Sequence, residues 1–201
     1  MELLKKFNKP DVIEGGIDEA GRGPLLGRVY AAVVIWPIEL ENHNIKDSKK
    51  ISAKKRKVLK TWIEKNVKDY GIGYADENEI DDLNILEATY LAMDRAINNL
   101  KNKPEHLIID GNRFKTKLDI PFDCVVKGDN TYYSIAAASI LAKEYHDEYI
   151  ENLCNSNQHL DKYYNLTSNK GYGTKAHLKG LNKHGISSFH RKTFIKSHHL
   201  N

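Results

Sequence analysis

The chain has 201 residues, 40% of them hydrophobic, and a formal net charge of +4 at pH 7. This length suits one domain with a buried core, and no apolar run reaches the roughly 18–20 residues of a membrane-spanning helix. Cys124 and Cys154 lack a Cys-x-x-Cys spacing, so neither a disulfide framework nor a zinc ribbon is indicated. No signal peptide is visible, and we expect an intracellular, cytoplasmic protein.

The charges are unevenly distributed along the chain. Residues 46–68 carry ten Lys/Arg against two acids, and residues 159–201 carry eight Lys/Arg and six His against one acid. The segment between them, 69–158, has seventeen acids against eight Lys/Arg. Basic segments that flank an acidic centre favour a polyanionic partner and a carboxylate-built metal site. The alternative for each basic run is an ordinary solvated helix face.

The first third of the chain predicts two strands followed by a basic helix. Residues 12–17 have the pattern of a short strand, and residues 29–36 form a near-continuous apolar run that ends at Pro37, typical of a buried strand. The short turn-rich link between them suggests a hairpin. Ser52 is a predicted N-cap for a helix that runs to about Val67, with one apolar face and one Lys/Arg face.

The middle of the chain alternates between strand and helix patterns. Strand, helix, strand, strand and helix are expected in turn over residues 70–75, 77–100, 106–112, 124–127 and 134–153. The last of these helices has an Ala-rich face that can pack tightly on a sheet.

The C-terminal part is predicted to be less regular. Residues 159–173 are rich in Tyr, Asn and Lys and are expected to form an irregular loop. Residues 175–183 predict a short helix that is capped by Thr174 and ended by Gly185. Residues 189–194 alternate basic and aromatic side chains.

This order of elements predicts an α/β fold with a mixed central sheet flanked by helices. We expect a main domain over residues 1–154 and a small C-terminal helical extension over residues 155–201, packed on it.

A Gly-Arg-Gly turn follows two adjacent acids, Asp18 and Glu19, at the end of the first predicted strand. Neighbours on a strand point to opposite faces, so the two acids share a site only where the strand ends or twists. Gly21 and Gly23 supply that break because glycine tolerates positive φ. Carboxylates, bare backbone N–H groups and the Arg22 guanidinium suit a divalent metal beside a phosphate. The alternative is a solvated loop after an edge strand, with Arg22 paired to Glu19.

Further acids share this strand-end position. Asp110 closes one apolar strand, and Asp129 lies just past another. Acids at strand ends on one edge of a sheet can converge, and their mutual repulsion would be relieved by cations that prefer oxygen ligands, such as Mg²⁺ or Mn²⁺. Two such ions about 4 Å apart suit in-line displacement at a phosphodiester. Asp147 is a possible fifth acid, although an exposed helical Asp is the favoured interpretation.

Competing chemistries are weakly supported. The glycine spacing after residue 20 is not a dinucleotide fingerprint, and a Gly-Lys-Ser/Thr P-loop is absent. The nine histidines show no metal-ligand spacing. Ser139 lies in a predicted Ala-rich helix with no nucleophile elbow, which argues against a serine hydrolase.

Seven sequence blocks carry a family pattern. The first reads Gly-Ile-Asp-Glu-Ala-Gly-Arg-Gly-Pro-Leu, and the sixth reads Lys-Gly-Tyr-Gly-Thr. The blocks are residues 16–25, 47–50, 108–111, 127–129, 136–143, 170–174 and 190–194. In this order and combination they resemble type 2 ribonucleases H (ribonuclease HII).

The resemblance implies an RNase H-like fold and a hydrolase that acts in ribonucleotide excision repair. It implies cleavage of the RNA strand of RNA/DNA hybrids and incision 5′ to single ribonucleotides embedded in duplex DNA, leaving 3′-hydroxyl and 5′-phosphate ends. It also implies that the metal-binding catalytic acids, with Mg²⁺ or Mn²⁺ as cofactor, are Asp18, Glu19, Asp110 and Asp129. A monomer without membrane partners is expected.

Substrate contacts are also implied. Gly21, Arg22 and Gly23 would contact the ribonucleotide 2′-hydroxyl and its phosphate, and Tyr172 would stack on the sugar at the RNA–DNA junction. The 2′-hydroxyl is the group that distinguishes RNA from DNA.

Basic side chains in the other blocks are candidate phosphate ligands. Lys49 and Lys143 are the main candidates, and His177, His190 and Arg191 are the weaker ones.

The chain departs from the family pattern at three places. Arg28 stands where a Pro is usual, His146 where an Arg is usual, and Asn169 where a His is common. These changes bear on phosphate contacts and on pH or salt optima. The related ribonuclease HIII has a sizeable N-terminal extension and a Lys in place of Arg22, so we favour the HII type. A non-catalytic hybrid binder and a transposase-like or resolvase-like nuclease are the remaining alternatives.

Overall fold

The computed structural model describes residues 3–7, 11–45, 48 and 51–196. Its centre is a five-stranded mixed sheet in the order β3-β2-β1-β4-β5. The strands are β1 (Glu14–Ala20), β2 (Val29–Ile35), β3 (Asp69–Ala75), β4 (His106–Asp110) and β5 (Phe122–Val125). β1, β2 and β3 form an antiparallel meander, whereas β4 and β5 run parallel to β1.

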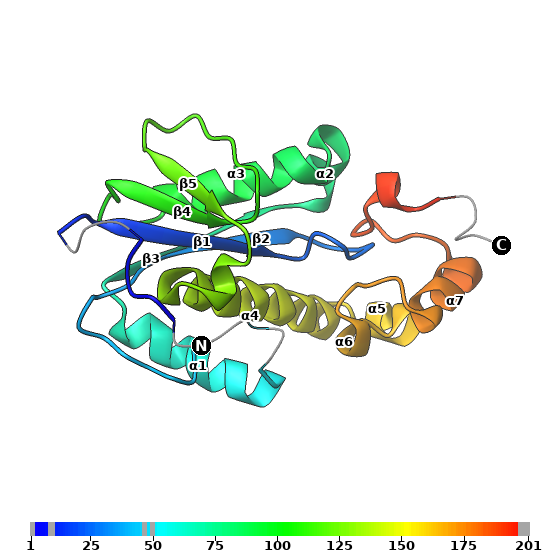
Figure 1. The fold of residues 1–201 in the computed structure, drawn as a ribbon. Helices are drawn as coiled ribbons and strands as arrows, with labels where there is room; N and C mark the ends of the chain where they lie inside the picture. Colours follow the sequence, from blue (N-terminus) through cyan, green and yellow to red (C-terminus); the bar gives the residue numbers. More distant parts are fainter. Residues whose placement is uncertain (1–2, 8–10, 46–47, 49–50, 197–201) are drawn as a thin grey trace.

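Helices cover both faces of this sheet (Figure 1). One face is covered by α2 (Glu77–Leu83) and α3 (Ile85–Asn98), and the other by α4 (Tyr133–Ser156), with α1 (Ala53–Asn66) packed outside α4. The alternation of side chains along β2 explains the two layers. Ala31 and Val33 belong to the core under α3, whereas Ala32 and Val34 belong to the core under α4. This arrangement confirms the predicted α/β fold.

The contact between β1 and α4 is unusually close and sets the depth of the site. A Cβ atom on Gly16 would collide with the Ser134 hydroxyl group and would lie 2.6 Å from the Ile135 backbone nitrogen. Only glycine therefore lets α4 lie against β1 at this point. As a result, side chains from the middle of α4 reach the acids at the end of β1.

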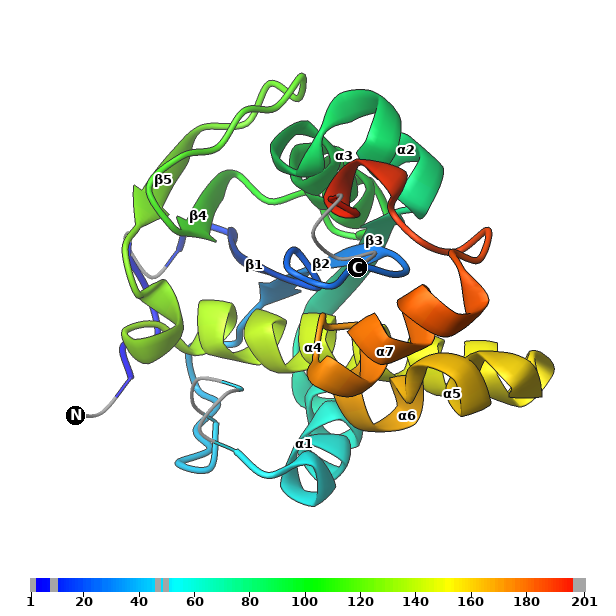
Figure 2. The ribbon, with the colours of Figure 1, turned by 90° about the vertical axis from the view of Figure 1, so that its right-hand side faces the viewer.

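The C-terminal helices form a separate group beside the end of α4 (Figure 2). They are α5 (Gln158–Tyr164), α6 (Leu166–Asn169) and α7 (Lys175–His184), followed by the short 3-10 turn η3 (Lys192–Phe194). Their shared core contains Ile150 from α4 together with Leu160, Leu166 and Leu181. α7 begins at its predicted cap, Thr174, whose side chain accepts a hydrogen bond from the His177 backbone nitrogen.

Two predictions about secondary structure were wrong. The helix expected over 77–100 is broken at Asn84, which adopts φ 72° and caps α3 through its side chain; asparagine is among the residues that tolerate positive φ. The loop expected over 159–173 contains α5 and α6, because Leu160, Tyr164 and Leu166 are buried against α4 and α7 and stabilise helix where the polar composition did not suggest it.

The strand boundaries also refine the site. β1 continues to Ala20, so both acids lie within the strand, and β1 is flanked by β2 and β4. The edge strand assumed by the alternative interpretation is therefore excluded. α4 runs through Ser156, past the boundary expected at residue 154, and the division into two parts stays a prediction. Along the described segments, none of the helices has the length and apolar character that crossing a bilayer requires.

Candidate active site

Three of the predicted acids meet at one edge of the sheet. Asp18 comes from β1, Asp110 from the end of β4, and Asp129 from the 3-10 turn η2 (Gly128–Asn130) after β5. One carboxylate oxygen from each lies within 4.8 Å of the others. β1, β4 and β5 are parallel neighbours, so their carboxyl ends bring these acids together. The predicted convergence is confirmed for this trio.

Short hydrogen bonds fix the orientation of Asp110 and Asp129. The Gly128 backbone N–H donates to Asp110 Oδ1 over 2.7 Å, and the Asn130 side-chain amide donates to Asp129 Oδ1 over 2.7 Å. The turn that follows β5 therefore positions the Asp110 side chain and also supplies Asp129. Both carboxylates are thus held in place at the site, and carboxylate oxygens are ligands that hard cations prefer.

Asp18 is buried and has an unfavourable electrostatic environment. Burial raises its pKa well above the ordinary value, and the neighbouring charges of Glu19 and Asp110 raise it further. Hydrogen bonds from the Ser139 hydroxyl and the Glu19 backbone N–H oppose this shift. A bound divalent cation would relieve both the burial and the repulsion. The donor set, carboxylate oxygens only, fits Mg²⁺ or Mn²⁺.

Glu19 differs from the other predicted ligands. Within the described segments, it is not a member of the group of acids whose oxygens approach within 4.8 Å. Its Oε1 accepts a hydrogen bond from Arg22 Nη1 over 3.1 Å, the pair expected in the alternative interpretation. Glu19 nevertheless lines the same cavity as Asp18 and acts on its pKa. It therefore lies at the site, outside the tight aspartate trio.

A cavity of about 230 Å³ opens beside Asp18. Most of the residues predicted to bind substrate line it. Its lining consists of Asp18, Glu19, Ala20, Gly21, Arg22, Gly23, Ser48, Ser139, Lys143 and Tyr172. Lys49, also predicted to bind phosphate, lies outside the described residues. The Gly-Arg-Gly turn, Lys143 and Tyr172 thus share one cavity with the acids, although they lie far apart in the sequence.

The Gly-Arg-Gly turn and Tyr172 form one wall of this cavity. Gly21 has φ +90°, and a Cβ atom there would collide with the His146 ring, so both the conformation and the space require glycine. A Cβ atom on Gly23 would lie 3.2 Å from Tyr172 Cε1, which shows that the tyrosine ring faces the turn. Tyr172 is 42% exposed, enough to present part of its ring to a ligand.

Arg191 binds the backbone of the Gly-Arg-Gly turn from the interior of the protein. Its guanidinium donates to the carbonyl oxygens of Gly21 (2.6 Å), Arg22 (3.1 Å) and Pro24 (2.8 Å), and its Nε donates to that of Gly27 (2.7 Å). Its side chain is fully buried, and burial lowers its pKa to about 10. The prediction that Arg191 binds phosphate was wrong, because all its donors point into the protein.

His177 and His190 are buried as well, with exposures of 0% and 1%. They hydrogen-bond to each other, with their Nε2 atoms 3.0 Å apart. Neither side chain can reach a phosphate at the surface. Their predicted role as phosphate ligands was also wrong.

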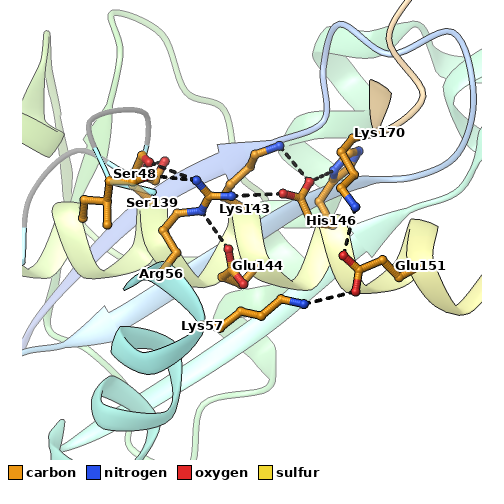
Figure 3. A network of polar contacts seen from close by, with 11 residues as sticks. Ser48, Arg56, Lys57, Ser139, Lys143, Glu144, His146, Glu151 and Lys170 are labelled. Carbon is orange, nitrogen blue, oxygen red and sulfur yellow. Dashed lines mark hydrogen bonds and ion pairs between the residues drawn. The ribbon is translucent and has the colours of Figure 1, made fainter. Parts of the chain in front are cut away.

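A network of ion pairs, which includes the cavity residue Lys143, links α1 and α4 (Figure 3). Lys143 Nζ donates to Asp147 Oδ1 over 2.7 Å, and Arg56 donates to Glu144 Oε1 (2.7 Å) and to Asp147 Oδ2 (3.2 Å). Burial would raise the pKa of Asp147, but hydrogen bonds from His146 and Lys143 lower it below the ordinary value. Asp147 is only 5% exposed, so the prediction of an exposed helical acid was wrong. It stabilises the packing of α1 on α4.

Acids on α4 form ion pairs with some of the lysines in the basic run of α1. Lys57 pairs with Glu151 and Lys60 with Glu148, both on α4. Exposed lysines of this run include Lys54 and Lys55. The basic run is therefore partly structural, and its support for a polyanionic partner is smaller than the sequence suggested.

Ser48 and Ser139 were not predicted as site residues. Ser139 hydrogen-bonds to Asp18 and lies 2.9 Å from the Ser48 hydroxyl oxygen, and both line the cavity. Ser139 precedes Lys143 by one helical turn, so the two occupy one face of α4. Its spacing from Lys143 was the signal in the sequence that could have identified Ser139 as a site residue.

The fold and the site define a class: a protein of the RNase H-like fold, with three aspartates that could hold a metal ion beside a cavity. The model of the family described as ribonuclease HII matches residues 15–199. The chain is 51% identical over 193 residues to ribonuclease HII of Parabacteroides distasonis, which covers 96% of this chain and 94% of that protein. It is 48% identical to ribonuclease HII of Phocaeicola vulgatus, over 96% of this chain and 93% of that protein.

The chain therefore belongs to the ribonuclease HII family, endoribonucleases that cleave RNA in RNA/DNA hybrids and at embedded ribonucleotides.

Solved structures agree on the fold. Ribonuclease H2 of Pyrococcus horikoshii superposes with a TM-score of 0.71 at 25% identity, covering 90% of this chain and 92% of that one. Ribonuclease HII of Archaeoglobus fulgidus, solved in complex with PCNA, gives a TM-score of 0.72 at 24% identity, covering 90% and 93%. Bst-RNase HIII, solved in complex with Mn²⁺, gives 0.66 at 21% identity, covering 86% and 62%.

Proposed function

We propose that the chain incises duplex DNA on the 5′ side of single embedded ribonucleotides and cleaves the RNA strand of RNA/DNA hybrids by two-metal-ion hydrolysis. The products would carry 3′-hydroxyl and 5′-phosphate ends. The observation that carries this proposal is the meeting of three aspartate oxygens within 4.8 Å of one another. The cavity that the Gly-Arg-Gly turn lines opens beside this trio, at Asp18.

The acids have two parts in the proposed reaction. Asp18, Asp110 and Asp129 would hold divalent cations, and Glu19, at the rim of the trio, would complete the metal site once Arg22 turns to a substrate phosphate. Bound cations supply an activated water and neutralise charge on the leaving oxygen. The Ser139 hydroxyl and the Gly128 N–H keep the carboxylates Asp18 and Asp110 oriented toward one point.

Recognition of the ribonucleotide is assigned to the wall formed by the Gly-Arg-Gly turn and Tyr172. The backbone N–H groups and the Arg22 guanidinium of the Gly-Arg-Gly turn are proposed to bind the 2′-hydroxyl and its phosphate, since bare glycine backbone permits a close approach. Tyr172 faces Gly23 and exposes part of its ring, which supports stacking on the sugar at the junction. Lys143 lines the cavity and is proposed to contact a phosphate.

We assign Mg²⁺ or Mn²⁺ as the cofactor, because all donors in the trio are carboxylate oxygens. We also propose that the protein acts as a monomer in the cytoplasm. One chain supplies the acids, the turn and the tyrosine. The expected ligands are RNA/DNA hybrids and ribonucleotide-containing duplex DNA.

The proposal is tested by incision of a DNA duplex that contains one ribonucleotide. The same duplex made entirely of DNA serves as the matched control, and each is incubated with Mg²⁺ or with EDTA. We expect one cut, 5′ to the ribonucleotide, only with the embedded ribonucleotide and only with Mg²⁺. Cleavage of the all-DNA duplex, or undiminished cleavage in EDTA, would contradict the proposal.

A further inference from the structure

The wall that we assign to ribonucleotide recognition is held by two consecutive buried residues of the C-terminal tail. Arg191 binds the carbonyl oxygens of the turn, as described above. His190, its neighbour, contacts His177, which in turn contacts the Tyr172 backbone. The Gly-Arg-Gly turn and Tyr172 are about 150 residues apart in the chain, and both are thereby connected to the dipeptide His190-Arg191.

The hydrogen-bond partners at the two ends determine where each imidazole carries its proton. His177 Nδ1 lies 3.0 Å from the Tyr172 carbonyl oxygen, which can only accept, so Nδ1 of His177 carries hydrogen. His190 Nδ1 lies 2.9 Å from the Ser187 backbone nitrogen, which can only donate, so Nδ1 of His190 is bare. A neutral His190 then carries its hydrogen on Nε2 and donates it to the bare Nε2 of His177, 3.0 Å away.

The result is a one-directional relay of hydrogen bonds from Ser187 through His190 and His177 to the Tyr172 carbonyl group. Its surroundings keep both rings neutral. Burial and the facing His177 lower the pKa of His190 to about 4, and burial lowers the pKa of His177. The Tyr164 ring packs against both, with ring centroids 4.8 Å from His190 and 5.6 Å from His177. The relay is therefore closed to solvent, and its surroundings favour the neutral form of both rings.

Backbone hydrogen bonds tie the same elements together. The Leu25 N–H donates to the Gly171 carbonyl oxygen over 2.8 Å, and the Arg191 N–H donates to the Leu25 carbonyl oxygen over 2.9 Å. The loop after the turn thus lies between the segment before Tyr172 and the tail. Tyr172 and Gly23 cannot shift independently unless these bonds or the relay break.

We propose that His177 and His190 are positioning residues that, through this tautomer-fixed relay, hold Tyr172 against the Gly-Arg-Gly turn and thereby set the selectivity for single ribonucleotides over long hybrids. The inference builds on the proposed function, in which Tyr172 and the turn read the junction. A misplacement of about 1 Å in such a wall can reduce a rate roughly 100-fold. The metal site is formed by other residues, so a long hybrid, which offers ribonucleotides at every position, depends less on the wall.

The first test observes the relay directly in the full-length protein. Long-range ¹H–¹⁵N correlation spectra of the imidazoles report which nitrogen of each ring is protonated. We expect Nδ1–H for His177 and Nε2–H for His190, unchanged between pH 6 and pH 8. The opposite tautomers, or rapid averaging between tautomers, would overturn the proposal without any variant having to fold.

The second test measures selectivity in variants. His177→Phe keeps an aromatic ring but removes both nitrogens, and we expect incision at a single ribonucleotide to fall roughly 10-fold to 100-fold, with a change of only a few-fold on a long hybrid. His177→Asn keeps a donor near the Nδ1 position and should recover part of the loss. His184→Asn, on the same helix but outside the relay, is the matched control and should leave both rates unchanged.

A comparison with Tyr172→Ala separates this inference from the function on which it builds. If Tyr172→Ala leaves selectivity unchanged, the proposed reading of the junction fails. If Tyr172→Ala reduces selectivity but His177→Phe does not, the relay proposal alone fails. The double variant should lose no more selectivity than Tyr172→Ala, because His177 acts through Tyr172; fully additive losses would contradict a positioning role. Thermal unfolding of each variant confirms that the measured molecules are folded.

Discussion

Asp18 and Asp147 are two buried aspartates on neighbouring elements, with exposures of 7% and 5%, but their pKa values shift in opposite directions. Asp18 faces the like charges of Glu19 and Asp110 and has a raised pKa. Asp147 is buried too, but hydrogen bonds from His146 and Lys143 lower its pKa, and it accepts a further hydrogen bond from Arg56. The two neighbourhoods adjoin, because Ser139, which hydrogen-bonds to Asp18, contacts Ser48, whose carbonyl oxygen faces Arg56.

The difference shows that burial alone does not define a metal ligand. Around Asp147, cations of the protein itself compensate the carboxylates, and the cluster stabilises the packing of α1 on α4. Around Asp18, the nearest charges are other carboxylates, so the folded protein holds electrostatic repulsion that an external cation can relieve. The predictions below change the balance of charges around Asp18 and around Asp147, and they run from the largest expected effect to the smallest.

The largest effect is expected for Asp110→Asn, which removes one negative charge from the acidic trio. Loss of a metal ligand forfeits several kcal/mol of transition-state stabilisation, so we expect cleavage to fall at least about 1000-fold. Rates on an RNA/DNA hybrid in Mg²⁺ measure this loss, and binding of the hybrid in Ca²⁺ checks that the variant still engages substrate. Wild-type activity in this variant would remove Asp110 from the site.

A loss of stability is expected for Asp147→Asn. It leaves Arg56 and Lys143 without one of their acidic partners, and breaking a buried pair costs roughly 3 kcal/mol. Urea unfolding at pH 7 in EDTA measures the free energy of unfolding. The pKa of Asp147 is lowered in the folded state, so its contribution is present at neutral pH and is lost as the pH falls through that lowered value.

Asp18→Asn is the matched control and should behave in the opposite way. Asp18 has a raised pKa in the folded state, so its ionisation destabilises the metal-free fold as the pH rises above its ordinary value. Replacing it with a neutral isostere should therefore increase the free energy of unfolding in EDTA. Equal destabilisation by both substitutions would show that the two clusters do not differ as described.

Addition of Mg²⁺ should stabilise the wild-type protein. A ligand at 100 times its dissociation constant adds about 2.7 kcal/mol, and Asp18→Asn should lose most of this gain. Because the proton on Asp18 competes with the cation, the shift in unfolding temperature should shrink as the pH is lowered. A shift that is independent of pH and equal in the two proteins would indicate that Mg²⁺ binds elsewhere.

The smallest effect on stability is expected for Arg22→Ala. Its ion pair with Glu19 is exposed, with 48% of the arginine side chain accessible, and such pairs contribute about 0.2–1 kcal/mol. Hybrid binding should weaken clearly and depend less on salt concentration, because a phosphate contact is lost. A large loss of stability with unchanged binding would assign Arg22 to the fold instead of the substrate.

Local patterns predicted most of the fold. The β-branched run at 29–36 forms β2, and α7 begins after Thr174 and ends before Gly185, as expected. Prediction failed where tertiary contacts outweigh composition. The polar stretch after residue 158 is helical because its few apolar residues pack on α4. The break at Asn84 depends on a backbone conformation that helical periodicity does not reveal.

The acids of the site could be predicted from the sequence, whereas the roles of the residues that hold the site in place could not. Strand-end positions pointed to Asp18, Asp110 and Asp129, because topology brings such positions together. The roles of Arg191 and the histidines were missed, since a basic residue in a sequence gives no sign that its donors bind distant carbonyl groups. Asp147 was misjudged for the same reason, because its partner Arg56 is 91 residues away.

The central claim is that Asp18, Asp110 and Asp129 jointly hold divalent metal beside the cavity that contains the Gly-Arg-Gly turn. Diffraction from crystals soaked in Mn²⁺, recorded at a wavelength where manganese scatters anomalously, tests it most directly. We predict anomalous peaks within coordination distance of oxygens from all three aspartates, and their absence in Asp18→Asn crystals. Manganese bound only at other acids, or none at the trio, would contradict the account.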